Sequence, residues 1–96
     1  MLVRRKRSNK RKRRFYEAFE FNFSINFKEI SVFLGNLGKV EIESQDNIIS
    51  GLYIETNDGR KICAGQYLLK DDRREKILSF DSTIFYEFYD ILWRNT

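Results

Sequence analysis

The residues best suited to bind a ligand form a basic cluster near the start of the chain. It holds six arginines, three lysines and no acidic residue: Arg4, Arg5, Lys6, Arg7, Lys10, Arg11, Lys12, Arg13 and Arg14. Such side chains displace the counterions of a phosphate backbone, and arginine adds bidentate phosphate contacts and stacking on bases. The cluster therefore predicts binding to nucleic acid, with an affinity that falls as salt rises. A solubilising charge, an address tag or attraction to an anionic lipid surface are its other interpretations.

The charge of the chain is divided between two parts of opposite sign. Residues 1–14 hold nine of the 18 basic residues and no acid, which gives +9; residues 15–96 hold the other nine and all 14 acids, which gives −5. An acidic surface is repelled by nucleic acid. We therefore expect a basic arm that binds phosphates and an acidic body that contacts protein. Removal of residues 1–14 should then abolish binding and leave the fold intact.

Residues that usually perform catalysis are scarce. The chain has no histidine and one cysteine, Cys63, so an activated thiol and a conventional zinc site both lack their usual imidazole. Asp71, Asp72 and Glu75 are close enough in sequence to suggest Mg²⁺ binding, but the neighbouring arginines and lysine favour a solvated charge cluster. We therefore predict no enzymatic activity, no metal and no cofactor, and the role of Cys63 stays open.

Alternating residues predict a strand at the start of the body. Odd positions from Phe15 to Phe27 are mostly phenylalanine or isoleucine, and alanine, glutamate, asparagine and serine fall between them. A period of two is typical of a strand with one face on a core. The stretch GKVEIES alternates in the same way and predicts a second, exposed strand.

Two further segments carry turn signals. Residues 28–38 suit either a short helix, because Ile30, Phe33, Leu34 and Leu37 share one helical face, or a hairpin at Gly35; we expect the helix. Asn57, Asp58 and Gly59 predict the turn of a hairpin over residues 50–68, because asparagine and glycine accept positive φ at low cost. Cys63 would lie in a strand of this hairpin.

The end of the chain predicts an amphipathic helix. Asp81 or Ser82 can cap it, and the apolar pattern continues to about Arg94. On this helix Tyr86, Tyr89 and Trp93 would form one aromatic stripe, and interfaces favour tyrosine and tryptophan, so we predict a partner-binding surface there. The preceding stretch KDDRREKIL suits a shorter helix or a charged loop.

Together these elements predict an α+β fold. We expect residues 1–14 to be a disordered basic arm, because a segment with so few apolar residues cannot bury enough surface to fold. Residues 15–96 should form a single small domain. Its antiparallel sheet should have about four strands, followed by the C-terminal amphipathic helix.

A family resemblance rests on the stretch RSNKRKRRFYE in front of a small mixed domain. This stretch resembles the arginine-rich, disordered N-terminal arm of phage-encoded anti-CRISPR proteins that inhibit Cas9, and the segments GKVEIES and NDGRKI are similar to the strands that follow that arm. The resemblance implies an inhibitor whose arm engages a nuclease–nucleic acid complex through the nine cations named above. It leaves the docking surface of the body undefined.

We therefore predict a non-enzymatic phage or mobile-element protein that engages nucleic acid, or a nuclease–nucleic acid complex, as an inhibitor in the cytoplasm of the host cell. Two alternatives stay open: a small structural protein of a ribosome or other ribonucleoprotein, and a protein adaptor with a basic address tag. No run approaches the ~18 apolar residues of a membrane span, so we expect no membrane partner. The choice between DNA and RNA and the oligomeric state are not predicted.

Overall fold

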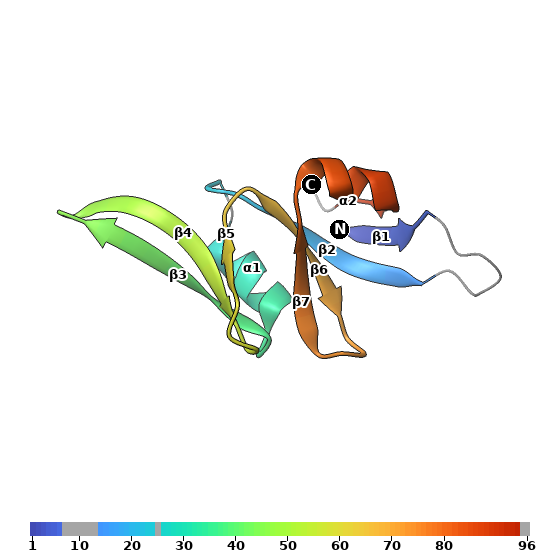
Figure 1. Cartoon of the computed structure of the whole chain (residues 1–96), viewed down its shortest axis with the longest axis horizontal. Helices are drawn as coiled ribbons and strands as arrows, with labels where there is room; N and C mark the ends of the chain where they lie inside the picture. Colours follow the sequence, from blue (N-terminus) through green and yellow to red (C-terminus); the bar gives the residue numbers. More distant parts are fainter. Residues whose placement is uncertain (7–13, 25, 95–96) are drawn as a thin grey trace.

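The computed structural model describes residues 1–6, 14–24 and 26–94, and this part of the chain is mostly β-structure. Its elements, in chain order, are β1 (Leu2–Arg5), β2 (Phe15–Phe21), α1 (Phe27–Leu34), β3 (Gly38–Gln45), β4 (Ile48–Thr56), β5 (Lys61–Cys63), β6 (Gln66–Asp71), β7 (Lys76–Phe80), α2 (Ser82–Phe88) and β8 (Tyr89–Trp93). Two antiparallel sheets result, one in the order β7-β6-β2-β1-β8 and one in the order β3-β4-β5 (Figure 1). The expected α+β fold with about four strands and a long C-terminal helix is therefore wrong.

The first strand, β1, lies inside the five-stranded sheet. Val3 pairs with Tyr16 of β2 on one side and with Ile91 of β8 on the other, and its side chain is fully buried. The expectation that all of residues 1–14 form a disordered arm is thus wrong for Leu2–Arg5. A strand needs only one buried apolar side chain in every two residues, so a run as short as LVRR can fold once two neighbours supply its backbone hydrogen bonds. Removal of residues 1–14 would take out an interior strand of the sheet and would not leave the fold intact.

The predicted C-terminal helix is only half right. Asp81 caps α2, where its side chain accepts a hydrogen bond from the amide of Ile84 at 2.8 Å, as expected. The helix ends at Phe88, however, because Tyr89 takes an extended conformation (φ −128°, ψ 138°) and begins β8. Aromatic and β-branched residues suit a strand as well as a helix, and here β1 offers a sheet edge to pair with. Tertiary pairing therefore overrides the helical pattern.

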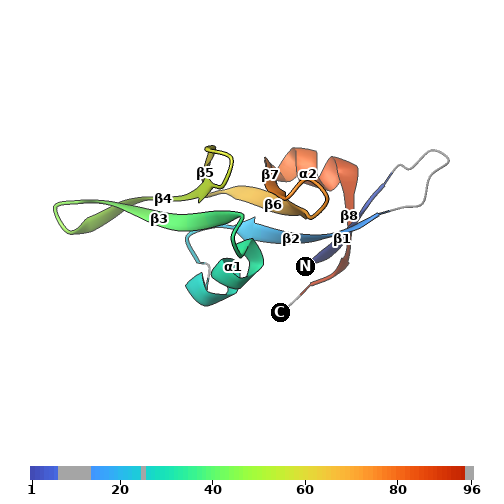
Figure 2. The same ribbon diagram turned by 90° about the horizontal axis from the view of Figure 1, so that it is seen from below.

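Two hydrophobic cores lie on opposite faces of the five-stranded sheet, as Figure 2 shows from the positions of α1 and α2. Strand β6 serves both cores, because Leu68 points to one face and Tyr67 and Leu69 to the other. The first core fills the space toward α1 and the three-stranded sheet: Phe21, Ile30, Phe33, Leu34, Leu37, Leu52, Ile54, Ile62, Leu68 and Ile77. The second lies under α2: Val3, Ala18, Tyr67, Leu69, Phe85 and Tyr89.

Other predicted elements are confirmed. The helix expected within residues 28–38 is α1, which Asn26 caps by accepting hydrogen bonds from the amides of Lys28 and Glu29. The turn at Gly59 (φ +87°) joins β4 to β5, as the hairpin prediction required. The phenylalanine-rich strand ends earlier than expected, at Phe21.

The stretch KDDRREKIL does not form a helix. Its first residues end β6, its middle residues form a charged turn, and its last residues begin β7. Of the two alternatives, a short helix or a charged loop, only the charged loop is found, and only at the turn. Glu75 takes a positive φ of 52° in this turn. Strands β6 and β7, on either side of this turn, form a hairpin that the sequence pattern did not predict.

The position of β1 in the core leads to a matched pair of stability predictions. Val3 is 0% exposed and Val32, on α1, is 73% exposed. We expect Val3→Ala to lower the free energy of unfolding by about 2 kcal/mol through lost burial and a cavity. Val32→Ala should change it by less than about 0.5 kcal/mol. Urea denaturation followed by circular dichroism measures both; equal effects would contradict an interior, core-forming position for β1.

Candidate nucleic-acid interface

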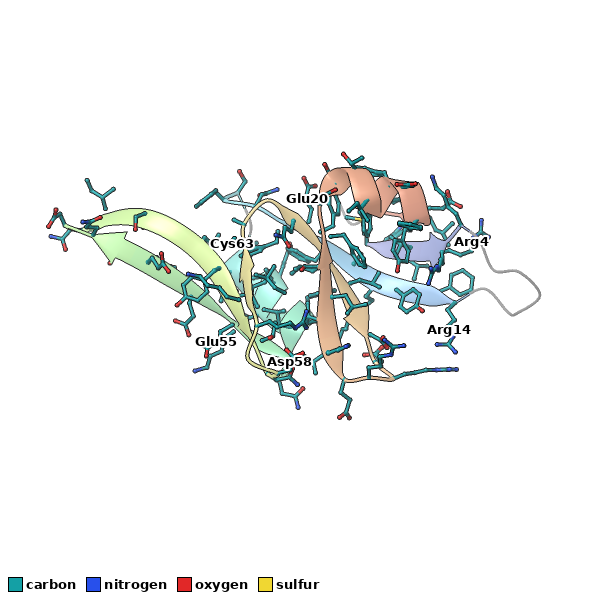
Figure 3. All side chains as sticks on the ribbon, in the orientation of Figure 1. Arg4, Arg14, Glu20, Glu55, Asp58 and Cys63 are labelled. Atoms are coloured by element: carbon teal, nitrogen blue, oxygen red, sulfur yellow. The ribbon has the colours of Figure 1, made fainter. Side chains whose placement is uncertain are left out.

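The nine predicted phosphate-binding residues lie in and beside the connection between two paired strands. Strand β1 ends at Arg5 and β2 begins at Phe15, and Arg4 pairs with Phe15 across the ladder. Both ends of this connection are therefore fixed at one end of the sheet, where Arg4 and Arg14 are labelled in Figure 3. Five members of the predicted set lie outside the described residues: Arg7, Lys10, Arg11, Lys12 and Arg13.

The four described cations differ in solvent exposure and in their contacts with other side chains. Arg4 is half-buried, with one terminal guanidinium nitrogen 3.8 Å from the Asp90 carboxylate; its Nε has no hydrogen-bond partner among the described residues. The guanidinium of Arg5 lies 6.0 Å from the centre of the Phe88 ring, a long cation–π distance. Lys6 and Arg14 are exposed. Arg4 is thus partly neutralised within the fold, whereas the other three can face a ligand.

Two phenyl rings lie exposed beside these cations. Phe15 is 59% and Phe88 44% exposed. Bases of a single strand stack on aromatic rings in many nucleic-acid-binding proteins. Sequence reasoning missed these rings because it placed Phe15 on the core face of its strand and expected residue 88 to lie within a long amphipathic helix. We call the end of the sheet that carries Arg5, Lys6, Arg14, Phe15 and Phe88 the basic end; Phe15 lies on the face opposite to that of Phe88, because its neighbour Tyr16 packs under α2.

The turn between β6 and β7 adds charges next to the basic end. Glu17 of β2 pairs with Lys70 of β6, so the end of β6 lies beside the start of β2. Arg14, Lys70 and Arg73 line a shallow pocket of about 290 Å³ there, together with Asp71 and Asp72. These carboxylates offset part of the positive charge. Lys70 and Arg73 were missed because the β6–β7 hairpin was not predicted.

The predicted partner-binding stripe of Tyr86, Tyr89 and Trp93 does not exist as one helical face. Because α2 ends at Phe88, Tyr89 and Trp93 belong to β8. Tyr89 is only 7% exposed and packs on Phe85, with ring centres 5.4 Å apart. Tyr86 and Trp93 are 41% and 60% exposed. A partner role for these two residues stays a prediction, on two separate elements.

Tyr86 belongs to a small hydrogen-bond network. Its hydroxyl lies 2.6 Å from that of Tyr67 and accepts a hydrogen bond from Arg94 at 3.1 Å. Burial, followed by the bond to Tyr86, raises the pKa of Tyr67 to about 12. The same bond, with that from Arg94, lowers the pKa of Tyr86. The network fixes the end of β8 to α2 and β6.

A wide groove of about 930 Å³ opens between α1 and the strands β1, β2 and β8. Its apolar lining residues are Leu2, Phe19, Val32, Phe33 and Trp93. Charged groups of both signs line it as well: Glu17, Glu20, Glu29, Lys28 and Arg94. With its mixture of charges, this groove lacks the uniform positive lining of a phosphate-binding site.

The described residues offer little that points to other chemistry. Among them, no group of three histidine, cysteine or acidic side chains comes together in the way that a metal site requires. Cys63 is an exposed thiol on β5, and its role stays open. No helix in the described part of the chain is both long and apolar enough to cross a bilayer.

The fold and the site together define a small protein of two antiparallel sheets with a basic, aromatic surface at one end of the larger sheet. Comparison of the chain with models of protein families, with curated proteins and with solved structures found no match. Its function must therefore be argued from its own residues.

The tyrosine network predicts a pH dependence of stability. In the unfolded chain Tyr67 ionises near the ordinary value of 10, whereas in the folded protein its pKa is about 12. Between these values the unfolded state has lost a proton that the folded state keeps, so stability is intact below pH 10 and falls as the pH rises to 12. We expect Tyr67→Phe to reduce this fall and to raise the pKa of Tyr86, which loses a donor.

Phenolate absorbance and urea denaturation across this pH range measure both effects. Tyr53→Phe, which removes a tyrosine from the other sheet, is the control and should leave the late ionisation in place. If the ionisation near pH 12 keeps its full amplitude in Tyr67→Phe, it belongs to a different residue.

Proposed function

We propose that the chain is a non-enzymatic protein that binds nucleic acid through its basic end and the adjoining β1–β2 connection. The observation on which this proposal rests is the placement of the basic cluster. Nine cations of residues 4–14 begin on one strand and end beside the next, so both ends of the segment that carries them are fixed at one end of a folded sheet. A cluster anchored on both sides loses less conformational freedom on binding than a free arm would lose.

Phosphate contacts would supply most of the affinity. Lysine and arginine release condensed counterions as they neutralise phosphates, so binding should be strong at low salt and weak at high salt. The exposed rings of Phe15 and Phe88 support a preference for single strands, or for bases that have left a duplex, because a paired base hides its face within the stack.

The acidic body supports a role as an inhibitor of a nucleic-acid-handling complex. Residues 15–96 carry −5 and would be repelled by nucleic acid. We infer that they contact protein, so that the basic end reaches a phosphate path while the body docks beside it, as the resemblance to anti-CRISPR proteins implies. The cytoplasm of a host cell is the matching location. A ribosomal protein is less well supported, because such proteins are usually basic in the body as well.

A charge-matched pair of variants tests the site. Lys6→Gln with Arg14→Gln removes two exposed cations of the basic end, and Lys28→Gln with Lys39→Gln removes two exposed cations elsewhere. On duplex DNA the slope of log K against log salt should become less negative by about 2 in the first variant, at roughly 0.9 for each lost phosphate contact. It should hardly change in the second.

Fluorescence anisotropy with labelled strands over a salt series gives both slopes. Equal losses in the two variants would mean that net charge alone drives binding, and absence of binding by the unaltered chain at low salt would end the proposal. Deletion of residues 1–14 is not a valid test, because it removes β1.

Stacking is tested with three matched phenylalanines. Phe15→Leu and Phe88→Leu should each weaken single-strand binding about tenfold, as expected for the loss of one base–ring stack. Phe23→Leu is the control, because Phe23 is 70% exposed but lies outside the basic end, after the other end of β2. Titrations of single strand and duplex separate stacking from charge; a loss that is the same on both ligands would argue against base stacking.

A further inference from the structure

The β3–β4 hairpin projects from the body and is unsupported at its far end. Strand β5 pairs with β4 only from Tyr53 to Glu55, so residues 41–51 extend from the edge of the three-stranded part, at Glu41, into a ribbon of two strands beyond it. We call these residues the distal hairpin. Figures 1 and 2 show it at one extreme of the long axis. Two-stranded ribbons are barely stable alone in water, and a contact on this ribbon would stabilise it.

The distal hairpin combines exposed apolar side chains with negative charge. Ile42, Ile48 and Ile49 are 48%, 70% and 62% exposed. Ile42 pairs with Leu52, which belongs to the core, so the apolar face of the hairpin continues from the core into solvent. The segment contains three acids and no base within its own residues: Glu41, Glu43 and Asp46. Lys61 of β5 reaches one of them, with its Nζ 2.8 Å from a carboxylate oxygen of Glu43.

The basic end has the complementary properties and lies at the opposite extreme. It presents the exposed cations Arg5, Lys6 and Arg14 around the exposed rings of Phe15 and Phe88. Figure 3 shows Arg4 and Arg14 at this extreme and the distal hairpin at the other. The molecule is 54 Å long and at most 24 Å wide. The two surfaces therefore cannot meet within one molecule.

We propose that the distal hairpin of one copy docks on the basic end of a second copy. Opposite charges and exposed apolar side chains on both surfaces favour this contact, whereas two hairpins or two basic ends would repel each other. The contact joins two different surfaces, so a pair of copies keeps one free hairpin and one free basic end, and short chains of molecules grow from head to tail. A hairpin tip buries little area, so the association is weak and sensitive to salt.

Self-association of this kind would compete with nucleic acid for the basic end. Phosphates and the carboxylates of the distal hairpin would seek the same cations, so added oligonucleotide should release single copies. This competition depends on the proposed function; the head-to-tail contact itself does not. The decisive experiment therefore contains no nucleic acid.

Two charge-reversed variants of the full chain test the contact by complementation. The first, Glu41→Lys with Glu43→Lys, alters the hairpin and keeps the basic end. The second, Lys6→Glu with Arg14→Glu, alters the basic end and keeps the hairpin. Sedimentation velocity at about 50 mM salt should show concentration-dependent association of the unaltered chain, lost at about 500 mM, where screening is strong. Each variant alone should associate at least about tenfold more weakly.

An equimolar mixture of the two variants should associate again, because the unaltered basic end of the first variant matches the unaltered hairpin of the second, and the reversed charges on their other two surfaces are also of opposite sign. Glu20→Lys with Glu29→Lys changes the net charge as the hairpin variant does, but on the groove, and should still form chains. Circular dichroism confirms that every variant is folded, and Glu41→Gln with Glu43→Gln replaces the hairpin variant if it is not.

Three outcomes would overturn the proposal. They are a monomeric unaltered chain at low salt, self-association of the basic-end variant as strong as that of the unaltered chain, and a mixture of folded variants that associates no better than either variant alone.

Discussion

The fold depends on the pairing of β1 between β2 and β8. Val3 joins both neighbours and fills the core under α2, so the first residues of the chain form an interior strand that connects the edge strand β8 to the rest of the sheet. Without β1, the last strand would have no partner in this sheet, and α2 would lose part of the surface on which it packs. The same pairing fixes both ends of the basic connection. One backbone ladder therefore builds the sheet and positions the charge.

Local patterns in the sequence predicted the elements whose signals are local. The apolar spacing of Ile30, Phe33 and Leu34 marked α1, Asp81 marked the start of α2, and Gly59 marked a hairpin turn. The patterns failed where pairing between distant segments decides the outcome. Val3 is the single apolar side chain of β1 that the second core takes up, and Tyr89 begins a strand because β1 lies alongside it. Neither fact is visible within a short window of sequence.

The sequence predicted which cations belong to the candidate site but not the structure that positions them. Counting charges located the cations, and the difference in sign between the two parts of the chain is plain in the sequence. The free arm became a connection between paired strands, and the aromatic stripe became two separate surfaces once the helix ended at Phe88. Exposure of Phe15 and Phe88 beside the cations needed the strand register, which places one ring opposite Arg4 and the other next to the residue that pairs with Arg5.

The central claim is that nucleic acid binds at the basic end of an intact sheet. The most direct measurement is an NMR titration of the ¹⁵N-labelled full chain with a short single-stranded oligonucleotide at low salt. The account predicts that amide shifts change along residues 4–16 and near Phe88, while those of the distal hairpin, whose carboxylates repel phosphate, stay in place. Shift changes centred on the groove or on the distal hairpin, or none at all, would contradict it.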